Sequence, residues 1–348
     1  MYVYYSIASK LSAGIGYTAS KDIDELKKAG YLKQAITLDD IPINSNDSVL
    51  KDNAFDVLAS TRITKPVDIG HFWGNMAYAQ IQKVHNLGGK TIVQRASSHI
   101  NTQNRIMLEE YKRFGFNSVP IHPWVIKKSL AEFKETDYVT VSSRFAYDSF
   151  RDENYPEEKL LLNPFGIDTE KFRPLDIERS DCFKVAFFGE NWVRKGLHYL
   201  LKAWSELGLK NAKLYVRSSS PPFFNDINYD TIEHIGWVED LTRFYNTLDV
   251  FCLPTLEEGN ALVVNEVSSC SIPSITTHNS GTWLDEKSCF FVPVRDVKAL
   301  KDMIQYCYDN HDELKKVGRE ARKKAEENTW ARYGENLINN YLNIINNG

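Results

Sequence analysis

The stretch Leu253-Pro254-Thr255-Leu256-Glu257-Glu258-Gly259-Asn260-Ala261-Leu262-Val263-Val264-Asn265-Glu266 indicates the architecture of this chain. It continues the apolar run 249–253, and a Pro-Thr turn, an acidic pair and a glycine then lead into a second apolar segment. This order is typical of a βα unit, and in sheets built from such units ligands bind at the carboxyl ends of the strands. Seven residues separate Glu258 from Glu266, so we expect both acids near one face of a single helix, with Glu258 at its mouth.

The residue types in this stretch suit a ligand that carries both hydroxyls and phosphate. Carboxylates accept paired hydrogen bonds from hydroxyls, and a helix start led by Gly259 presents backbone N–H groups and the positive end of a dipole to phosphate. Acidic residues are common on helices, so this interpretation depends on the strand and turn before the pair rather than on the spacing alone.

Composition limits the class of protein. The chain has 348 residues, of which 43% are hydrophobic, so it is long enough for two domains with a core each. The net charge of −4 argues against a general nucleic-acid binder. Five cysteines without a CxxC pair are typical of buried thiols in a reducing cytosol. The first residues show no secretory signal pattern and no run is long enough to span a bilayer, so we expect a cytoplasmic protein.

Short apolar runs alternate with helical patterns along the whole sequence, which is the βαβ rhythm of parallel sheets. Strands are predicted at 2–7, 35–38, 55–60, 67–70, 91–95, 138–142, 184–188, 213–217, 248–253 and 272–276. Proline and glycine interrupt the pattern between residues 160 and 180, where we place the domain boundary. The helix predicted over 101–114 carries Arg105, Lys112 and Arg113, which could contact lipid head groups, although a solvated face also explains them.

Two turns are candidates for binding phosphate. Arg194 and Lys195 precede the helix predicted from Leu197, and cations at a helix N-terminus are unfavourable unless an anion joins them, so we expect a diphosphate there. Near the N-terminus, Gly14 and Gly16 begin a G-x-G-x-x-A pattern that is also found in nicotinamide dinucleotide sites. A loop separates this pattern from its strand, which favours a flexible interdomain loop over a dinucleotide fingerprint.

Histidines at the ends of two strand-like runs, His71 and His99, complete the polar candidates, and His99 is the better one for a sugar or phosphate contact. The sequence contains no H-E-x-x-H, G-x-S-x-G or Walker loop, so zincin, α/β-hydrolase and P-loop chemistry have no support.

Taken in order, these segments resemble the retaining glycosyltransferases of family 4, which have the GT-B fold. The resemblance runs from about residue 60 to the C-terminus. It is carried by the histidines at 71 and 99, Asp137–Ser142, Asn163–Asp168 with Phe172-Arg173-Pro174, Arg194-Lys195-Gly196, Gly236-Trp237-Val238 with Leu241–Tyr245, and Glu258-x7-Glu266. It implies an α/β chain of two Rossmann-like domains with parallel sheets that face each other across a cleft. Residues 1–175 would form the acceptor-side domain, with a C-terminal helix at 331–348 packing back onto it, and 176–330 the nucleotide-sugar domain.

The resemblance also implies roles for individual residues. Glu266 would bind the nucleotide ribose, Glu258 would lie near the donor sugar, and Lys195 with Arg194 would neutralise the leaving diphosphate. His99 would face the donor sugar. Backbone contacts to the donor are implied for Gly14, Gly16, Gly259, Asn260 and Ala261. The sequence departs from the family pattern at Glu190, where many members have arginine, and at Asn260-Ala261, where an aromatic residue and glycine are usual.

The function implied is transfer of a hexose from a UDP- or GDP-sugar to a glycan or lipid-linked acceptor, with retention of configuration and without a metal or other cofactor. The expected partners are the donor, the acceptor and a peripheral contact with the inner face of the membrane, and no nucleic acid is expected. Two alternatives stay open: a nicotinamide-dependent oxidoreductase that uses Gly14–Ala19, and a non-catalytic binder of nucleotide sugars.

Overall fold

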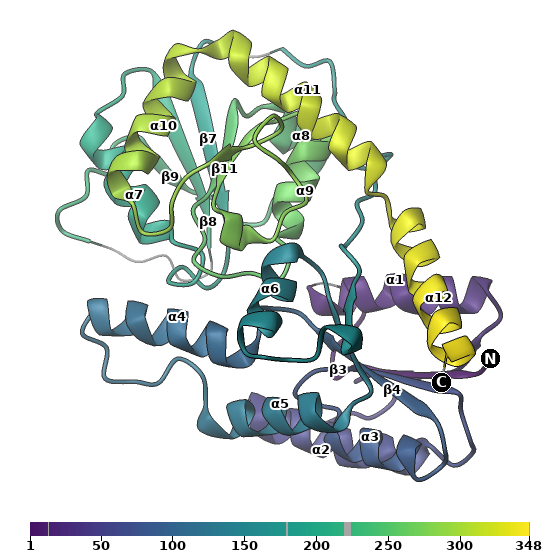
Figure 1. Ribbon diagram of the computed structural model, residues 1–348. Helices are drawn as coiled ribbons and strands as arrows, with labels where there is room; N and C mark the ends of the chain where they lie inside the picture. Colours follow the sequence, from purple (N-terminus) through teal and green to yellow (C-terminus); the bar gives the residue numbers. More distant parts are fainter. Residues whose placement is uncertain (13, 179, 219–223, 348) are drawn as a thin grey trace. The chain divides into compact units, whose positions relative to one another are not determined.

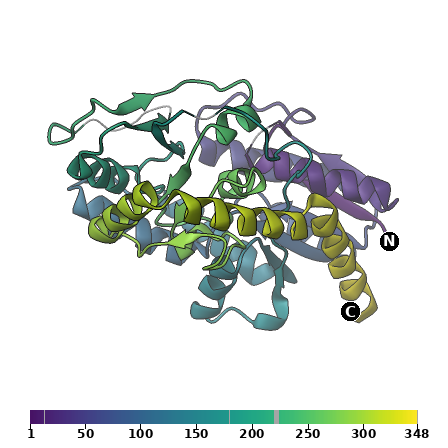
Figure 2. The ribbon, with the colours of Figure 1, turned by 90° about the horizontal axis from the view of Figure 1, so that it is seen from above.

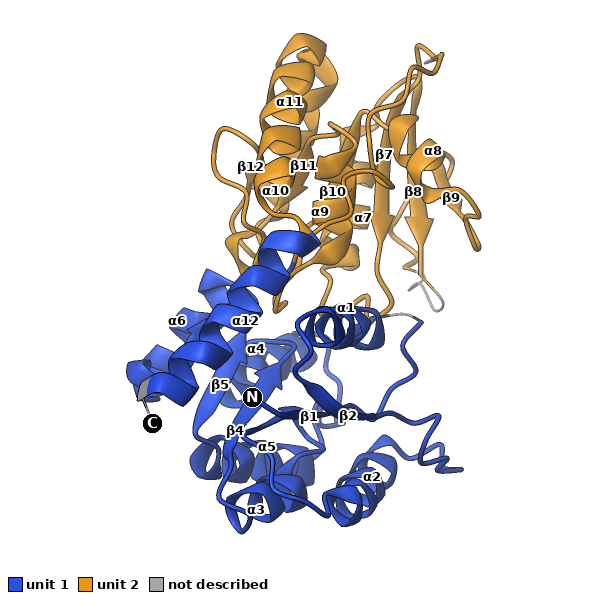
Figure 3. Cartoon of the chain, turned by 90° about the vertical axis from the view of Figure 1, so that its right-hand side faces the viewer, with its two compact units in different colours: residues 1–165, 330–348 blue, residues 166–329 orange. Residues whose placement is uncertain are grey.

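The computed structural model describes residues 1–12, 14–178, 180–218 and 224–347. Over these residues the chain forms two compact units, which Figure 3 distinguishes by colour. Unit 1 contains residues 1–165 and 330–348, and unit 2 contains residues 166–329. Each unit is built on its own six-stranded parallel sheet (Figure 1). These sheets agree with the predicted α/β class and its pair of Rossmann-like domains.

In unit 1 the strands lie in the order β2-β1-β3-β4-β5-β6. Helices α2, α3 and α5 cover one face of the sheet, and α1 and α12 cover the other (Figure 3). The strands are β1 (Val3–Ser6), β2 (Leu32–Ile36), β3 (Ile69–Trp73), β4 (Lys90–Arg95), β5 (Tyr138–Val141) and β6 (Leu160–Leu162). The helices are α1 (Ile15–Lys28), α2 (Ser48–Arg62), α3 (Tyr78–His85), α4 (Ile100–Arg113), α5 (Pro123–Glu135), α6 (Arg144–Asp152) and α12 (Trp330–Asn347).

In unit 2 the order β12-β11-β10-β7-β8-β9 is the strand order of the Rossmann fold, read from β9. Helix α7 packs against α10, and α9 packs against α11. The strands are β7 (Phe183–Phe188), β8 (Ala212–Arg217), β9 (Ile232–His234), β10 (Val250–Leu253), β11 (Ser274–Thr276) and β12 (Phe290–Phe291). The helices are α7 (Leu197–Leu207), α8 (Leu241–Asn246), α9 (Leu262–Ser269), α10 (Val297–Asp309) and α11 (His311–Glu327).

One predicted strand is wrong, because residues 55–60 lie inside helix α2. Asp47 caps this helix, its carboxylate accepting hydrogen bonds from the amides of Val49 at 2.8 Å and Leu50 at 3.2 Å. Phe55 and Ala59, four residues apart, are buried, whereas Val57 and Leu58 are exposed. The apolar run therefore follows the helical period rather than the alternation of a strand.

The domain boundary lies at residues 165 and 166, ahead of the predicted position at 175 and 176. Ile167 and Phe172 are buried in the core of unit 2. Arg322 of helix α11 donates hydrogen bonds to the carbonyls of Thr169 at 3.1 Å and Phe172 at 3.0 Å. Residues 166–175 therefore belong to the second unit. The prolines and glycine that interrupt the sequence pattern here mark a segment packed onto unit 2 rather than a linker between the units.

The C-terminal helix α12 belongs to unit 1 and packs against α1 (Figure 2). Its Tyr333 hydroxyl donates a hydrogen bond of 2.5 Å to the buried carboxylate of Asp22 in α1, and the same carboxylate accepts one of 2.6 Å from Tyr5 in β1. Tyr341 contacts the ring nitrogen of His71 in β3. The helix is thus joined to the core of unit 1 by buried polar contacts as well as by apolar packing.

Cys252, Cys270, Cys289 and Cys307 are buried thiols, as predicted, whereas Cys182 is partly exposed. Within the described part of the chain, no helix combines the length and the apolar character that crossing a membrane requires.

Candidate donor site

The two charged sequence motifs of unit 2 lie where its strand order reverses. From β7 the chain proceeds to β8 and β9 on one side, and then to β10, β11 and β12 on the other. The connections that follow β7 and β10 therefore diverge, and in doubly wound sheets ligands bind at the carboxyl ends of the strands where this happens. The turn 189–196 follows β7, and the loop 254–261 follows β10. Both sequence motifs thus lie at the position where doubly wound sheets bind ligands.

Close backbone contacts join the turn to the loop. The carbonyl of Arg194 accepts hydrogen bonds from the amide of Leu256 at 2.8 Å and from the hydroxyl of Thr255 at 3.0 Å. Gly196 has a φ of 71°, and a Cβ there would overlap the carbonyl oxygen of Pro254. Glycine is therefore required at this position for conformation and for space. The turn and the loop form one substructure that fixes the side chains on both.

Four charged side chains meet in this substructure. The guanidinium of Arg194 lies 3.4 Å from a carboxylate oxygen of Glu257 and 3.2 Å from one of Glu258. Lys195 forms an ion pair with the other carboxylate oxygen of Glu258. Glu257 is completely buried, and Glu258 is buried as well. Two cations and two carboxylates balance to a net charge of zero, so we refer to these residues as the ion-pair cluster.

Burial and pairing act against each other on the pKa values of the cluster. Burial favours a neutral Glu258, but Arg194 and Lys195 outweigh it and hold the pKa of this carboxyl below its ordinary value. Burial likewise opposes the charge of Arg194, whose pKa is nevertheless raised by Glu258 and Glu257. For Lys195 burial dominates, and its pKa is lowered despite Glu258. Lys195, with one carboxylate partner against two for Arg194, is therefore the cation whose charge is less fully compensated.

Glu266 lies on helix α9, whereas Glu258 lies in the loop before it. The helix begins at Leu262, so the expectation that both acids share one helix is wrong. The buried polar side chain of Asn260 holds the preceding loop, because its amide oxygen accepts a 2.8 Å hydrogen bond from Asn265. The spacing of the two acids predicts a helix that already includes residues 258–261, but these four residues form a loop in the structure.

The Glu266 carboxylate accepts a hydrogen bond of 2.7 Å from the hydroxyl of Tyr245 in α8. Burial raises the pKa of Glu266 to about 6, although the Tyr245 hydroxyl acts in the opposite direction. Glu266 as a residue is partly exposed, and the Tyr245 hydroxyl orients its carboxylate. This is the arrangement expected of a hydroxyl acceptor.

Of the backbone amides predicted to contact a donor, that of Ala261 is already used. It donates a hydrogen bond of 3.0 Å to the carbonyl of Ser280. Gly259 is buried between Glu258 and Asn260 in the same loop. The donor role of the Ala261 amide therefore has a structural competitor, while the donor contacts of Gly259 and Asn260 stay predictions.

Gly14 and Gly16 lie in unit 1, at the start of helix α1. Gly14 occupies the N-cap position with a φ of 56°, and Gly16 belongs to the first turn of the helix. A Cβ on Gly16 would overlap the carbonyl oxygen of Lys10, so the loop after β1 folds closely over the helix start. Both glycines thus lie at the start of α1 within unit 1 rather than in an interdomain loop, while their predicted contacts with the donor stay predictions.

His99 caps helix α4 in unit 1. Its Nδ1 accepts a hydrogen bond of 3.3 Å from the amide of Asn101, and its ring packs edge-on against Phe150 at 4.8 Å between centroids. Burial lowers the pKa of His99 to about 4. The imidazole is therefore neutral at physiological pH and has a structural role as a helix cap, while its predicted contact with a donor sugar stays a prediction.

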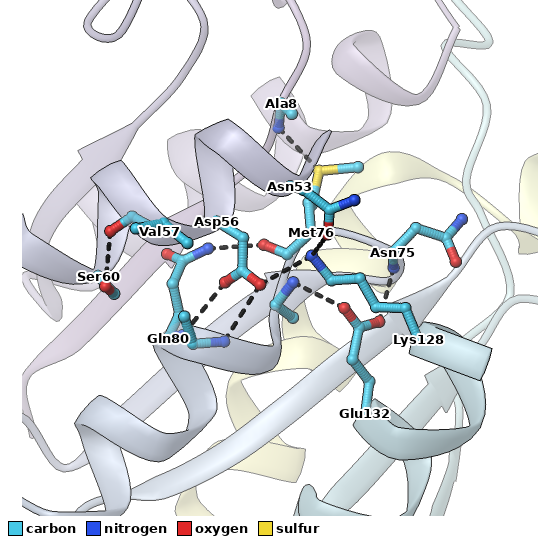
Figure 4. Close-up of polar contacts among 12 residues, drawn as sticks. Ala8, Asn53, Asp56, Val57, Ser60, Asn75, Met76, Gln80, Lys128 and Glu132 are labelled. Atoms are coloured by element: carbon cyan, nitrogen blue, oxygen red, sulfur yellow. Dashed lines mark hydrogen bonds and ion pairs between the residues drawn. The ribbon is translucent and has the colours of Figure 1, made fainter. Parts of the chain in front are cut away.

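Unit 1 has its own reversal of strand order, between β1 and β3. Figure 4 shows how buried polar side chains hold the loop after β3. Glu132 accepts hydrogen bonds from the amides of Asn75 at 2.6 Å and Ala77 at 2.8 Å. Asp56 forms an ion pair of 2.8 Å with Lys128. Asn75 has a φ of 76°, which side chains rarely adopt, so these contacts stabilise a strained turn at a position where ligands commonly bind.

The sequence analysis missed two residues of the candidate site, Glu257 and Tyr245. Glu257 stands beside the predicted Glu258, and its pairing with Arg194 could not be inferred because the turn and the loop are 63 residues apart. Tyr245 ends the segment Leu241–Tyr245, which is part of the resemblance, but its contact with Glu266, 21 residues away in sequence, becomes visible only in the structure. Among the described residues, no cluster of three or more His, Cys, Asp or Glu side chains is arranged to hold a metal ion.

Comparison with known proteins agrees with this architecture. Residues 182–310 match the family model "Glycosyl transferases group 1". The capsular polysaccharide biosynthesis glycosyltransferase CapM of Staphylococcus aureus is 26% identical over 58% of this chain and 60% of its own length. An α-1,3-galactosyltransferase of Escherichia coli that acts on a GlcNAc-diphosphoundecaprenol is 28% identical over 35% of this chain and 38% of its own. The chain thus matches less than two thirds of these relatives.

Solved structures resemble the whole chain. A sucrose-phosphate synthase from Thermosynechococcus elongatus superposes with a TM-score of 0.77 at 15% identity, covering 99% of both chains. HepE of Anabaena, solved with UDP-glucose, superposes with a TM-score of 0.69 at 12% identity, covering 98% of this chain and 99% of its own. At these identities the likeness shows the fold alone. Residues 182–310 are therefore similar to the glycosyl transferases group 1 family. The chain as a whole has the GT-B fold, as its resemblance to family 4 predicts.

Proposed function

We propose that the protein is a glycosyltransferase that moves a hexose from a UDP- or GDP-sugar to a glycan or lipid-linked acceptor, with retention of configuration and without a metal ion. The observation that carries the proposal is the ion-pair cluster at the strand-order reversal of unit 2, where Arg194 and Lys195 stand before helix α7. The group 1 match over the same unit and the sugar-transferring relatives support it.

In this proposal the ion-pair cluster and Glu266 divide the donor between them. The ribose hydroxyls donate to the Glu266 carboxylate, which Tyr245 orients. The diphosphate approaches Lys195 and Arg194 and competes with Glu258 for them. Glu258 then turns toward the donor sugar, so the same residue balances the cluster before binding and contacts the sugar after it.

The chemical step places negative charge on the departing diphosphate. The bond between C1 of the sugar and the diphosphate oxygen breaks, and its electron pair passes to that oxygen. The acceptor oxygen bonds to C1 from the same face, and its proton passes to the leaving diphosphate. Positioned cations stabilise the charge that develops in the transition state, and removing one such group commonly costs about 100-fold or more in rate. Lys195 has this role in the proposal.

A panel of UDP- and GDP-hexoses tests the proposal through the melting temperature of the full chain. A cognate donor at about 100 times its dissociation constant adds roughly 2.7 kcal/mol to the free energy of unfolding. Slow hydrolysis of that donor in water, followed by the anomeric proton signal of the released sugar, then reports catalysis and its stereochemistry. Inversion would overturn the retaining mechanism, and binding without any turnover would favour a non-catalytic nucleotide-sugar binder.

Lys195→Ala should reduce this hydrolysis by orders of magnitude, and Lys202→Ala is its matched control. Lys202 lies in the middle of α7, the helix that follows Lys195, and is exposed to solvent. Near-normal rates in Lys195→Ala would contradict the diphosphate role.

A further inference from the structure

Helix α2 carries apolar side chains on two of its faces. Phe55 and Ala59 on the inner face are buried. On the outer face the exposed fractions are 60% for Leu50, 57% for Val57 and 46% for Leu58. A surface helix of a globular protein normally turns charged and polar residues to solvent, and a second apolar face is typical of a helix that packs against a partner.

The outer apolar residues form a continuous stripe. They stand at positions 50, 54, 57, 58 and 61, which is the spacing of residues on one side of an α-helix. With about 100° of rotation per residue, these positions fall within roughly 100° of the helix circumference. The Thr61 hydroxyl donates a hydrogen bond of 2.7 Å to the carbonyl of Leu58, so its polar group is satisfied within the helix. We refer to Leu50, Ala54, Val57, Leu58 and Thr61 as the outer stripe of α2.

Opposite charges stand at the two ends of the outer stripe. Asp47 caps the start of α2 and Arg62 is its last residue, and both are exposed. The two cap bonds of Asp47 go to one carboxylate oxygen, Oδ1. Asp47 and Arg62 are 15 residues apart, which corresponds to about 60° of rotation on a helix, so both border the same flank of the stripe.

We propose that the outer stripe of α2 binds a second copy of this chain, with the two α2 helices antiparallel about a two-fold axis. Such an isologous interface uses the same patch on both chains. In this arrangement Leu50 of one helix faces Thr61 of the other, and Ala54 faces Val57. The small side chain of Ala54 near the centre lets the helix axes approach to about 8 Å, the lower end of the usual range.

The charges at the ends of the stripe match those of a second copy. The two-fold axis keeps the charged flanks of both helices on the same side, so Asp47 of each chain meets Arg62 of the other and two ion pairs form. A parallel pair would instead place like charges together, and its helix dipoles would repel each other. A lipid surface would favour cations at both ends of the stripe, which Asp47 does not supply.

The interface is small, because it is built from one helix of each chain. It buries less than the roughly 1,200 Å² at which standard interfaces begin, so we expect a reversible dimer with a dissociation constant on the order of 100 µM. The pairing uses only α2 of unit 1 and does not depend on the proposed glycosyl transfer. Loss of donor binding and loss of dimer formation are therefore separate outcomes.

Sedimentation velocity of the full chain tests the proposal. A single chain has a mass of 40.0 kDa. We expect the weight-average mass to rise toward twice this value as the protein concentration increases from about 1 µM to 1 mM, the range in which small interfaces associate. Leu50→Gln with Val57→Gln should weaken the dimer by about tenfold or more, because two aliphatic side chains are lost from each half of the interface.

Asp47→Ser and Arg62→Ala test the ion pairs separately from the apolar contact. Serine is also a favourable N-cap residue, so the start of α2 is retained. Each variant should weaken the dimer by about twofold to tenfold, as expected for two exposed ion pairs. The double variant should be no weaker than the weaker of the two, because both changes break the same ion pairs.

Matched control variants separate the stripe from general hydrophobicity and charge. Val119→Gln with Ile345→Gln removes apolar side chains of 60% and 39% exposure from other parts of unit 1. Arg319→Ala removes an exposed cation from α11 in unit 2. Both controls should dimerise as the unaltered protein does, and circular dichroism establishes that each variant is folded.

Three results would overturn the proposal. The first is an unaltered protein that stays monomeric over the whole concentration range. The second is an equal loss of dimer in the stripe variants and their controls. The third is an additive effect of Asp47→Ser and Arg62→Ala, which would show that these residues do not pair across the interface.

Discussion

At the scale of single residues, the main feature of the candidate donor site is the balance between its two cations and its two carboxylates. Arg194 is bound to two carboxylates, whereas Lys195 has one. Glu257 is buried and faces Arg194, so it takes up positive charge that a diphosphate would otherwise use. The sequence predicted the two cations and Glu258 from their positions after strands, but the charge balance became visible only when the two loops were brought together.

Glu257→Gln tests this balance and should strengthen the binding of nucleoside diphosphates. The substitution keeps the size of the side chain and leaves the ion-pair cluster with a net charge of about +1, which attracts an anion by on the order of tenfold at the effective dielectric of such sites. Isothermal titration calorimetry measures the change. Weaker binding by a folded Glu257→Gln protein would contradict the view that Glu257 offsets Arg194.

Binding of a nucleotide sugar should depend on pH through Glu266. Its pKa is raised to about 6, so the carboxylate is ionised above this pH and accepts ribose hydrogen bonds there, and affinity should fall as the pH drops through about 6. Tyr245→Phe removes a hydrogen bond that lowers this pKa, so the midpoint should move upward by about one pH unit. A nucleotide sugar is the suitable ligand because its capped diphosphate does not titrate in this range.

Glu266→Gln provides the control for this pH dependence. It should bind more weakly and without a midpoint near pH 6. If Glu266→Gln retains the pH profile of the unaltered protein, the titrating group is another residue and the ribose contact is unsupported.

At the scale of elements, the clearest feature is the attachment of α12 to unit 1. Asp22 accepts hydrogen bonds from Tyr333 and Tyr5 while it is completely buried. Burial raises its pKa from 3.8 to about 7, against the two hydrogen bonds. A raised pKa in the folded state means that the contribution of this group to stability is fully present below about 3.8 and is lost as the pH rises through about 7.

Asp22→Asn should remove this part of the pH dependence of stability. The unaltered protein should lose a few kcal/mol of unfolding free energy between these two pH values through Asp22, since each pKa unit corresponds to about 1.4 kcal/mol. Urea unfolding of the full chain across this pH range measures the change. Asp24→Asn, at an exposed position of the same helix, is the control. An equal loss in Asp22→Asn and in the unaltered protein would show that other groups are responsible.

At the scale of the whole molecule, the alternation of apolar runs predicted the α/β class and most strands of both sheets. The pattern failed where tertiary contacts decide the structure. Residues 55–60 are apolar enough for a strand, but the Asp47 cap and burial of one face make them helical. Short edge strands such as β9 and β12 carry too few residues for a periodic signal. The boundary was misplaced because Arg322, distant in sequence, attaches residues 169–172 to unit 2.

The loops that form the candidate site were predictable from the sequence, but the contacts between their side chains were not. Loops after parallel strands can be located from sequence, and ligand binding at a strand-order reversal follows from the topology. Which loops meet is set by strand order, and β7 lies beside β10 although two helices and two strands separate them along the described chain. Pairings such as Arg194 with Glu257 and Glu266 with Tyr245 therefore require the structure.

The central claim is that Lys195 belongs to a diphosphate site, and calorimetric titration with UDP and GDP tests it most directly. The account predicts that the unaltered protein and Lys202→Ala bind one of the two nucleotides with equal affinity. It predicts a loss of about tenfold to 100-fold in Lys195→Ala, as expected when a charged hydrogen bond is removed. Binding of neither nucleotide to the unaltered protein, or unchanged affinity in Lys195→Ala, would contradict the claim.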